Sequence, residues 1–227
     1  MTEPIDIPEA EKEVKPVPSR KGVLHTLAVV ISYVFHPLFM TLYIFFFIDK
    51  GYPFLFAHLG RVAYMQVVVV LVTNTVIYPL VTILLMKQLG FANSLQLRTQ
   101  RERIIPYIAM SVFYFWTFMV IRNLAIGELF NKIMLGGAIS IFMAFFLNNF
   151  YKISIHSVAA GNFVAVALVV TLLSNYNMEW AFASVMLLAG LIGSARLYLK
   201  AHRSRDIYSG YMIGVLSQMI AYRYLLN

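Results

Sequence analysis

Hydrophobic and polar positions along this chain are arranged in long blocks. Seven uncharged, apolar runs follow the first 22 residues, at 23–48, 62–86, 104–121, 133–151, 153–178, 180–195 and 207–222. A helix needs about 20 apolar residues to cross the hydrocarbon core of a membrane. Lipid offers no partner to a free backbone amide, so runs of this kind are predicted to be helices. The pattern predicts an all-α, polytopic transmembrane helix bundle of seven spans, or six if one segment lies at the membrane surface.

Individual residues refine this prediction. The run 180–195 is too short to span alone, so its helix is expected to continue through Arg196, which then lies at membrane depth. Pro37 and Pro79 fall inside apolar runs and predict kinks. Residues 1–22 combine four prolines with mixed charges and are predicted to be a disordered tail, which leaves 23–227 as one transmembrane helical domain.

The composition agrees with a membrane protein. Hydrophobic residues make up 60% of the 227, and charged residues only 12%, about half the share usual in soluble domains. The chain has no cysteine, which excludes disulfides, cysteine-bound zinc and thiol catalysis. The net charge of +8 is assigned to an anionic membrane surface or an anionic substrate, and nucleic acid is not expected as a partner.

Polar chemistry gathers in three clusters at the ends of the apolar runs. The first holds Arg98, Arg101 and Arg103; the second holds Lys152, Ser154 and His156; the third runs from Arg196 through His202 and Asp206. Two spans separate the first cluster from the second, and two more separate the second from the third. An even number of crossings returns the chain to the same face, so the three clusters are expected to converge on one side of the membrane.

The converging side chains suit phosphoryl transfer. Arginines hold an anion with paired donors and neutralise charge in the transition state. Histidines take acid and nucleophile roles near neutral pH. Asp206 follows His202 by four residues, a spacing that lets its carboxylate reach and orient the imidazole. His36, beside Pro37, is interpreted as a helix-packing residue and stays outside this predicted site. No cluster offers a plausible set of metal ligands, and no cofactor is expected.

The third cluster resembles a known signature. Arg196, five residues, His202, three residues and Asp206 keep the spacing of S-R-x5-H-x3-D in the type 2 phosphatidic acid phosphatase superfamily, with Ala195 in place of the usual serine. Gly210 follows at helical spacing with Gly214, a small-xxx-small pair that close helix packing alone would explain.

The other two signatures of that superfamily are altered. Ile153–His156 resembles P-S-G-H, with serine and histidine kept and isoleucines in place of proline and glycine. Arg103 with Pro106 is the nearest counterpart of K-x6-R-P, and Gln96 stands where the lysine is usual.

The resemblance implies a metal-independent lipid phosphate phosphatase. It implies that His202 is the nucleophile that forms a phosphohistidine, that Asp206 orients it, and that His156 protonates the leaving alcohol. The phosphate-binding residues implied are Arg196, Arg103, Arg101, Arg98 and Ser154.

Two further functions remain open on the same residues: a catalytically weakened binding or scaffold protein of the same fold, and a lipid phosphotransferase. A transporter or channel is disfavoured, because the ionisable residues lie at span ends. Phosphatidate, phosphatidylglycerol phosphate and polyprenyl diphosphates are equally compatible substrates. Seven spans would place thirteen of the 18 lysines and arginines on the side of the clusters. The positive-inside rule then predicts a bacterial-type inner-membrane protein with its site on the cytoplasmic face.

Overall fold

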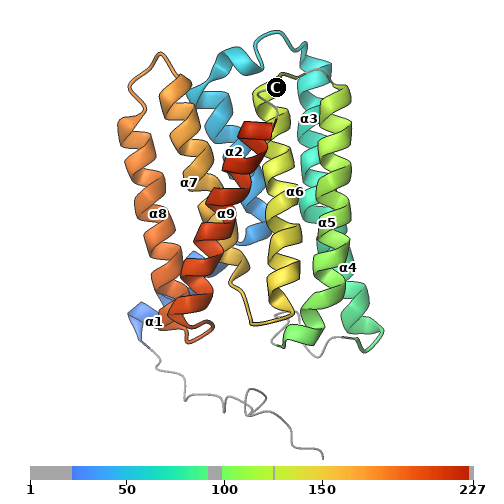
Figure 1. Cartoon of the computed structure of the whole chain (residues 1–227), viewed down its shortest axis with the longest axis vertical. Coiled ribbons are helices and arrows are strands. Elements are labelled where there is room, and N and C mark those ends of the chain that lie inside the picture. The colour runs from blue at the N-terminus through green and yellow to red at the C-terminus, as the bar shows by residue number, and fades with distance from the viewer. Residues whose placement is uncertain (1–21, 92–98, 125, 225–227) are drawn as a thin grey trace, which may run out of the picture.

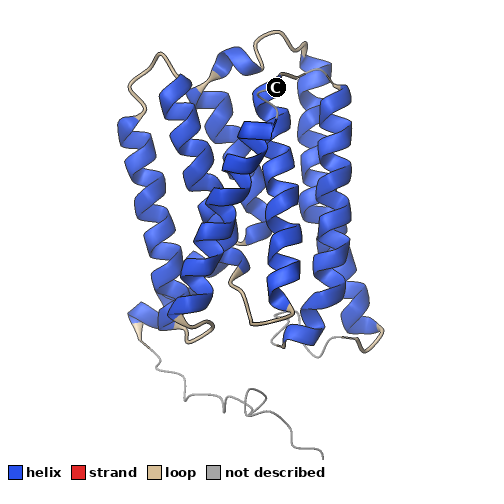
Figure 2. Cartoon of the chain, viewed as in Figure 1, coloured by secondary structure: helices blue, strands red, loops and turns tan. Residues whose placement is uncertain are grey.

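A computed structural model describes residues 22–91, 99–124 and 126–224 of the chain. All but the last residue of the predicted tail at 1–22, and Arg98 with it, lie outside the described residues. Within the described ranges the protein is built of helices and loops without strands, and long helices stand side by side in a bundle (Figures 1 and 2). The helices are α1 (Val23–Val34), α2 (Pro37–Gly51), η2 (Pro53–Leu55), α3 (Arg61–Val72), η3 (Thr73–Ile77), α4 (Tyr78–Gln88), α5 (Gln100–Asn123), α6 (Glu128–Asn148), α7 (Ile155–Leu173), α8 (Glu179–Tyr198) and α9 (Ser204–Tyr224).

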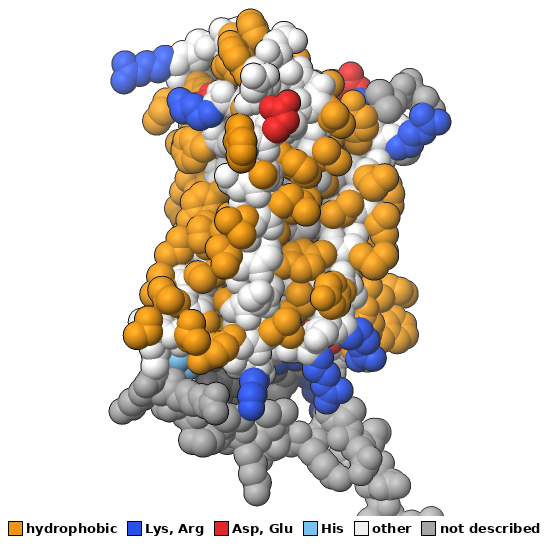
Figure 3. Space-filling model, turned by 90° about the vertical axis from the view of Figure 1, so that its left-hand side faces the viewer, with side chains coloured by type: hydrophobic (Ala, Val, Ile, Leu, Met, Phe, Trp, Pro, Cys, Tyr) orange, Lys and Arg blue, Asp and Glu red, His pale blue; other side chains and the backbone are white. Residues whose placement is uncertain are grey.

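The helices have the length and composition of membrane spans. In the described part of the chain, five helices are long and apolar enough to cross a membrane, with Arg61–Gln88 counted as one through its π-helical turn. The pair α1 and α2 gives a sixth candidate if it is taken as one broken span. On the face shown in Figure 3, hydrophobic side chains occupy the middle, and lysine and arginine lie toward the two ends. This arrangement confirms the polytopic helical bundle and fits an integral membrane protein.

Helix α9 matches the seventh predicted run and packs on α7 and α6. It falls short of the apolar composition of the other spans, because it carries polar residues toward the bundle interior, among them the buried Ser217 and Gln218. Its opposite face exposes a stripe of large apolar side chains: Tyr208, Met212, Leu216, Met219 and Ile220. A polar inner face with an apolar outer face is expected of a helix that borders lipid.

The first predicted run is two helices instead of one. Helix α1 ends at Val34 and α2 begins at Pro37, with an angle of 67° between them. Pro37 occupies the first position of α2, where its missing amide costs nothing, and the His36 side chain accepts a hydrogen bond from the amide of Leu38. Helix α1 packs against α8 at the lower end of the bundle (Figure 1). The kink predicted at Pro37 is therefore a full break.

The second predicted proline distortion lies in the segment Arg61–Gln88. A π-helical turn, Thr73–Ile77, directly precedes Tyr78 and Pro79. Such a wide turn is a known way for a helix to absorb a disturbed hydrogen-bond ladder. The structure therefore shows a π-helical turn in front of Pro79 within one continuous span, and the kink predicted there stays a prediction.

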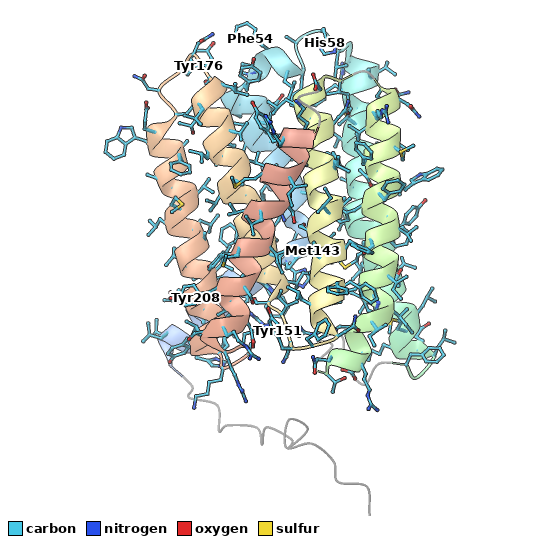
Figure 4. The ribbon with its side chains drawn as sticks, viewed as in Figure 1. Phe54, His58, Met143, Tyr151, Tyr176 and Tyr208 are labelled. Carbon is cyan, nitrogen blue, oxygen red and sulfur yellow. The ribbon has the colours of Figure 1, made fainter. Side chains whose placement is uncertain are left out.

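The three polar clusters lie at the same end of the bundle. The start of α5, the α6–α7 connection and the α8–α9 loop all reach the lower end, where α1 also lies (Figure 1). Tyr151 and Tyr208 mark this end in Figure 4, whereas Tyr176 and His58 mark the opposite end. The prediction that the three clusters lie on one face is confirmed for their described residues. This lower end of the bundle is called the site end.

Glycines bring α7 and α9 into backbone contact. A Cβ atom on Gly214 would lie 2.5 Å from the amide nitrogen of Asn162, and one on Gly210 would lie 2.8 Å from the carbonyl oxygen of Ser154. Gly161 on α7 faces the backbone of Tyr211 with equally little room. The Gly210–Gly214 pair therefore serves close helix packing, as predicted. The same contact sets the beginning of α9 beside the beginning of α7.

Candidate functional site

The first contribution to the site comes from the amino end of α5. Thr99 and Glu102 form a capping box, in which the Glu102 amide donates to the Thr99 hydroxyl at 3.3 Å and the Thr99 amide donates to the Glu102 carboxylate at 3.1 Å. This cap starts the helix so that Arg103 lies in its first turns. The Arg103 guanidinium, through Nη1, donates to the carbonyl of Ile153 at 3.0 Å, which joins the first cluster to the second.

The second contribution is the start of α7. Ser154 is fully buried and caps this helix: its hydroxyl accepts from the Ser157 hydroxyl at 3.0 Å and from the Ser157 amide at 3.4 Å. Among the described residues other than glycine, a positive φ occurs at Lys200 alone, so Ile155 begins α7 with ordinary right-handed backbone. The chain therefore forms this turn with isoleucine at the position where P-S-G-H has glycine. His156 follows in the first turn and is buried.

The third contribution is the end of α8 and the loop behind it. The amide of Ala201 donates to the carbonyl of Arg196 at 3.1 Å, and the amide of Lys200 donates to that of Leu197 at 2.9 Å. These are the two bonds of a Schellman motif, and Lys200 takes the left-handed conformation at φ 49° that glycine usually supplies. The motif ends α8 just after Arg196 and turns the chain back. His202 therefore lies in a short, fixed loop close to Arg196.

His202 and Asp206 form the centre of the cluster. Nδ1 of His202 lies 3.7 Å from Oδ2 of Asp206, and the two side chains are 2% and 7% exposed. The Asp206 carboxylate accepts the Arg203 amide at 2.9 Å, and the Asp206 carbonyl accepts the Ser154 amide at 3.2 Å. These bonds fix Asp206 between the α8–α9 loop and α7. The predicted pairing of His202 with Asp206 is present as a contact, 3.7 Å being longer than a hydrogen bond.

Two buried polar atoms of this cluster have no hydrogen-bond partner among the described residues. They are Nδ1 of His202 and Nε of Arg196. Buried polar atoms nearly always find partners, so such exceptions call for an explanation. Nδ1 of His202 faces the Asp206 carboxylate at more than hydrogen-bond distance, so Nε of Arg196 is the donor that a ligand would satisfy.

Burial lowers the pKa of His202 far below its ordinary value near 6.5, and the positive charges of Arg103, Arg196 and Lys152 lower it further. The imidazole is consequently neutral at neutral pH, which is the form that acts as a nucleophile. The same positive charges favour an anion beside it. Lys152 was noted in the second cluster but was not predicted as a site residue, and its nearness to His202 in space is information the sequence lacks.

A fourth segment, the break between α1 and α2, also reaches the site. Nε2 of His156 lies 3.1 Å from the carbonyl oxygen of Ser32, and the rings of His36 and His156 are 5.3 Å apart at 84°. His36 was interpreted as a helix-packing residue and left out of the predicted site; the structure places its ring against the ring of His156. Pro37 was the available signal, because a helix that begins at a proline has the residue before it, His36, as its N-cap.

The structure brings together Arg103, Ser154, His156, Arg196, His202 and Asp206 from α5, α7, α8 and α9. Arg101 is exposed near the start of α5. The cluster offers two imidazoles, two guanidinium groups and one carboxylate. Arginines of this kind can hold a phosphate while one imidazole attacks phosphorus and another serves the leaving oxygen.

Across residues 22–91, 99–124 and 126–224, no group of three or more histidine, aspartate or glutamate side chains is arranged to hold a metal ion. Comparison with known proteins adds no assignment: no protein-family model, curated protein or solved structure matches the chain at a significant level.

Proposed function

We propose that this protein is an integral-membrane phosphatase that removes phosphate from a lipid, in the manner of the type 2 phosphatidic acid phosphatases. The observation that supports it most is the buried, neutral His202 beside Asp206, surrounded by Arg103 and Arg196. The spacing of Arg196, His202 and Asp206 in the sequence supports the same reaction.

The proposed reaction has two steps. The neutral His202 attacks phosphorus through Nε2, because its Nδ1 faces Asp206. An N–P bond forms and the P–O bond to the lipid breaks. A proton brought by the phosphate monoanion passes through Nδ1 of His156 to the leaving alcohol oxygen, because Nε2 of His156 is directed to the Ser32 carbonyl. Water then attacks the phosphohistidine, one of its protons passes through the same nitrogen of His156 to the phosphate, and inorganic phosphate leaves, which restores both neutral imidazoles. Asp206 stabilises the positive charge that His202 gains when it attacks.

The test is phosphate release by the purified protein in detergent with a chelator present. The panel contains phosphatidate, phosphatidylglycerol phosphate and a polyprenyl diphosphate. Wild-type protein is expected to release phosphate from at least one of them, and His202→Ala is expected to abolish release while the protein still folds. His25→Ala, in the first turn of α1, is the matched control. Release by His202→Ala at the wild-type rate would refute the proposed mechanism.

A second function, binding of a lipid phosphate without turnover, is favoured by two contacts. Arg103 already donates to the Ile153 carbonyl, and the His202–Asp206 separation of 3.7 Å is longer than a hydrogen bond. A binder would retain a radioactive lipid phosphate on the protein without releasing phosphate. A lipid phosphotransferase would release little phosphate from the same substrate until an acceptor alcohol is added. The panel assay with and without an acceptor separates the three functions.

We further propose that the site faces the cytoplasm of a bacterial-type inner membrane, because basic residues are more numerous at the site end. The absence of native cysteine allows a direct test. Ser204, at the site end, and Asn177, at the opposite end, are both exposed. A single cysteine at Ser204 is expected to resist a membrane-impermeant thiol reagent in intact cells, whereas one at Asn177 reacts. The reverse pattern would place the site outside.

A further inference from the structure

His36 is an ionisable residue in an apolar run, held at the end of the bundle where the proposed site lies. Its ring packs edge to face on the ring of His156, with 5.3 Å between centroids. The positive charge of Arg196 lies close enough to act on both imidazoles. Ionisable side chains in membrane segments are costly and usually functional. The structure thus places a third imidazole next to the group proposed to serve the leaving oxygen.

One structural role of His36 is visible. Its Nδ1 accepts a hydrogen bond from the Leu38 amide at 3.4 Å and caps α2. That bond uses Nδ1 as an acceptor, so the hydrogen of the neutral ring sits on Nε2. Capping α2 does not require histidine, since asparagine, aspartate and serine are better caps. The cap therefore explains one nitrogen of the ring and leaves the other, a donor, to be explained.

The neighbouring arginine gives an independent indication of a ligand. Nε of Arg196 is a buried donor with no hydrogen-bond partner among the described residues. An oxyanion beside Arg196 would satisfy this donor and lie near the paired rings of His36 and His156. Nε2 of His156 is already directed to the Ser32 carbonyl at 3.1 Å, so it is not free to bind the same anion.

We infer that His36 is a phosphate-binding residue of the proposed active site, whose Nε2–H donates to an oxygen on the leaving-group side of the phosphoryl group. This inference rests on the proposed function, and it adds a segment that none of the three signatures contains. It makes α1 and α2 part of the catalytic unit through the break at Pro37. The ligand recognised is a phosphoryl group, for which vanadate is the probe because it reproduces the five-coordinate transition state.

The experiment separates the cap from the ring donor. His36→Asn keeps a side-chain oxygen that can accept the Leu38 amide and removes the imidazole; His36→Ala removes both. His25→Asn, in the first turn of α1, is the control. Thermal unfolding in detergent, vanadate affinity by calorimetry and the kcat and KM of phosphate release are measured for each protein. His36→Asn is expected to unfold like wild type and to bind vanadate about tenfold more weakly or worse, the size of one lost hydrogen bond to a charged group.

Failure of the inference about His36 can be distinguished from failure of the proposed phosphatase function. If wild type binds vanadate and His36→Asn binds it equally well, the ring serves packing or capping only, and the inference is wrong while the phosphatase remains. The same conclusion follows if His36→Ala loses affinity and His36→Asn restores it. If wild type neither binds vanadate nor releases phosphate, the proposed function fails and the inference falls with it.

Discussion

The glycine contact between α7 and α9 leads to a quantitative prediction, that Gly214→Ala destabilises the bundle. The added Cβ would meet the Val158 carbonyl oxygen, the Asn162 amide nitrogen at 2.5 Å and the carbonyl carbon of Gly161 at 2.8 Å. All three are backbone atoms and cannot rotate away, so the helices must separate by about 1 Å to reach ordinary contact. Overpacking of this kind costs about 1–3 kcal/mol. We expect Gly214→Ala to lower the free energy of unfolding by that amount.

The displacement is expected to reach the site. Asp206 lies eight residues before Gly214 on α9, about 12 Å along the helix axis. The Asp206 carbonyl accepts the Ser154 amide at 3.2 Å, a bond that a shift of about 1 Å would break. Gly214→Ala should therefore reduce phosphate release by more than the loss of folded protein alone accounts for.

The matched control is Gly190→Ala in α8. A Cβ there meets nothing within 4 Å, so the substitution is expected to stabilise the helix by up to about 1 kcal/mol. Thermal unfolding in one detergent, followed by circular dichroism, gives both values, and phosphate release is measured on the same samples. Equal unfolding temperatures and equal release for wild type and Gly214→Ala would refute the claim that this contact positions the site.

Four further outcomes are expected. Asp206→Asn should fold and lower turnover roughly a hundredfold or more, because His202 remains but loses its orienting carboxylate; unchanged turnover would remove Asp206 from the mechanism. Release should survive EDTA, and a loss restored by a divalent ion would indicate another enzyme class. Lys200→Gly should stabilise the protein by about 1 kcal/mol, since glycine adopts the left-handed conformation freely, and a clear loss in thermal unfolding would contradict the strain assigned there. Burial lowers the pKa of His202 in the folded protein, so only the unfolded chain binds a proton at this residue as the pH falls below about 6.5, and the wild-type protein loses stability. His202→Gln lacks this group, so unfolding scans at pH 7 and pH 5 should show a smaller loss of stability for the variant than for wild type.

The sequence predicted the bundle because lipid constrains composition strongly. Runs of apolar residues located the spans, and the extension of 180–195 through Arg196 is confirmed by the end of α8 at Tyr198. The break at Phe35 and His36 was not predicted in full. A proline signals a disturbed helix, but the angle of the break depends on how α1 packs against α8. A local sequence pattern does not contain that contact.

The site was predictable where local spacing carries the geometry. The spacing of four residues from His202 to Asp206 predicts that their side chains meet, and that contact is present. That His36 lies against His156 and Lys152 lies near His202 depends on contacts between segments far apart in the chain, which spacing cannot encode. Ser154 has a role that its signature position does not indicate: its hydroxyl accepts two hydrogen bonds from Ser157 and caps α7, while its predicted contact with phosphate stays a prediction.

Trapping of the covalent intermediate tests the central proposal most directly. The purified protein is mixed with a lipid substrate labelled in its phosphate, quenched in alkali within one turnover and digested for mass spectrometry. Phosphoryl transfer through His202 predicts an acid-labile, alkali-stable phosphate on the peptide that contains His202, and its absence from His202→Ala. Release of phosphate by the wild-type protein without that label, or with the label on another residue, would contradict the proposal.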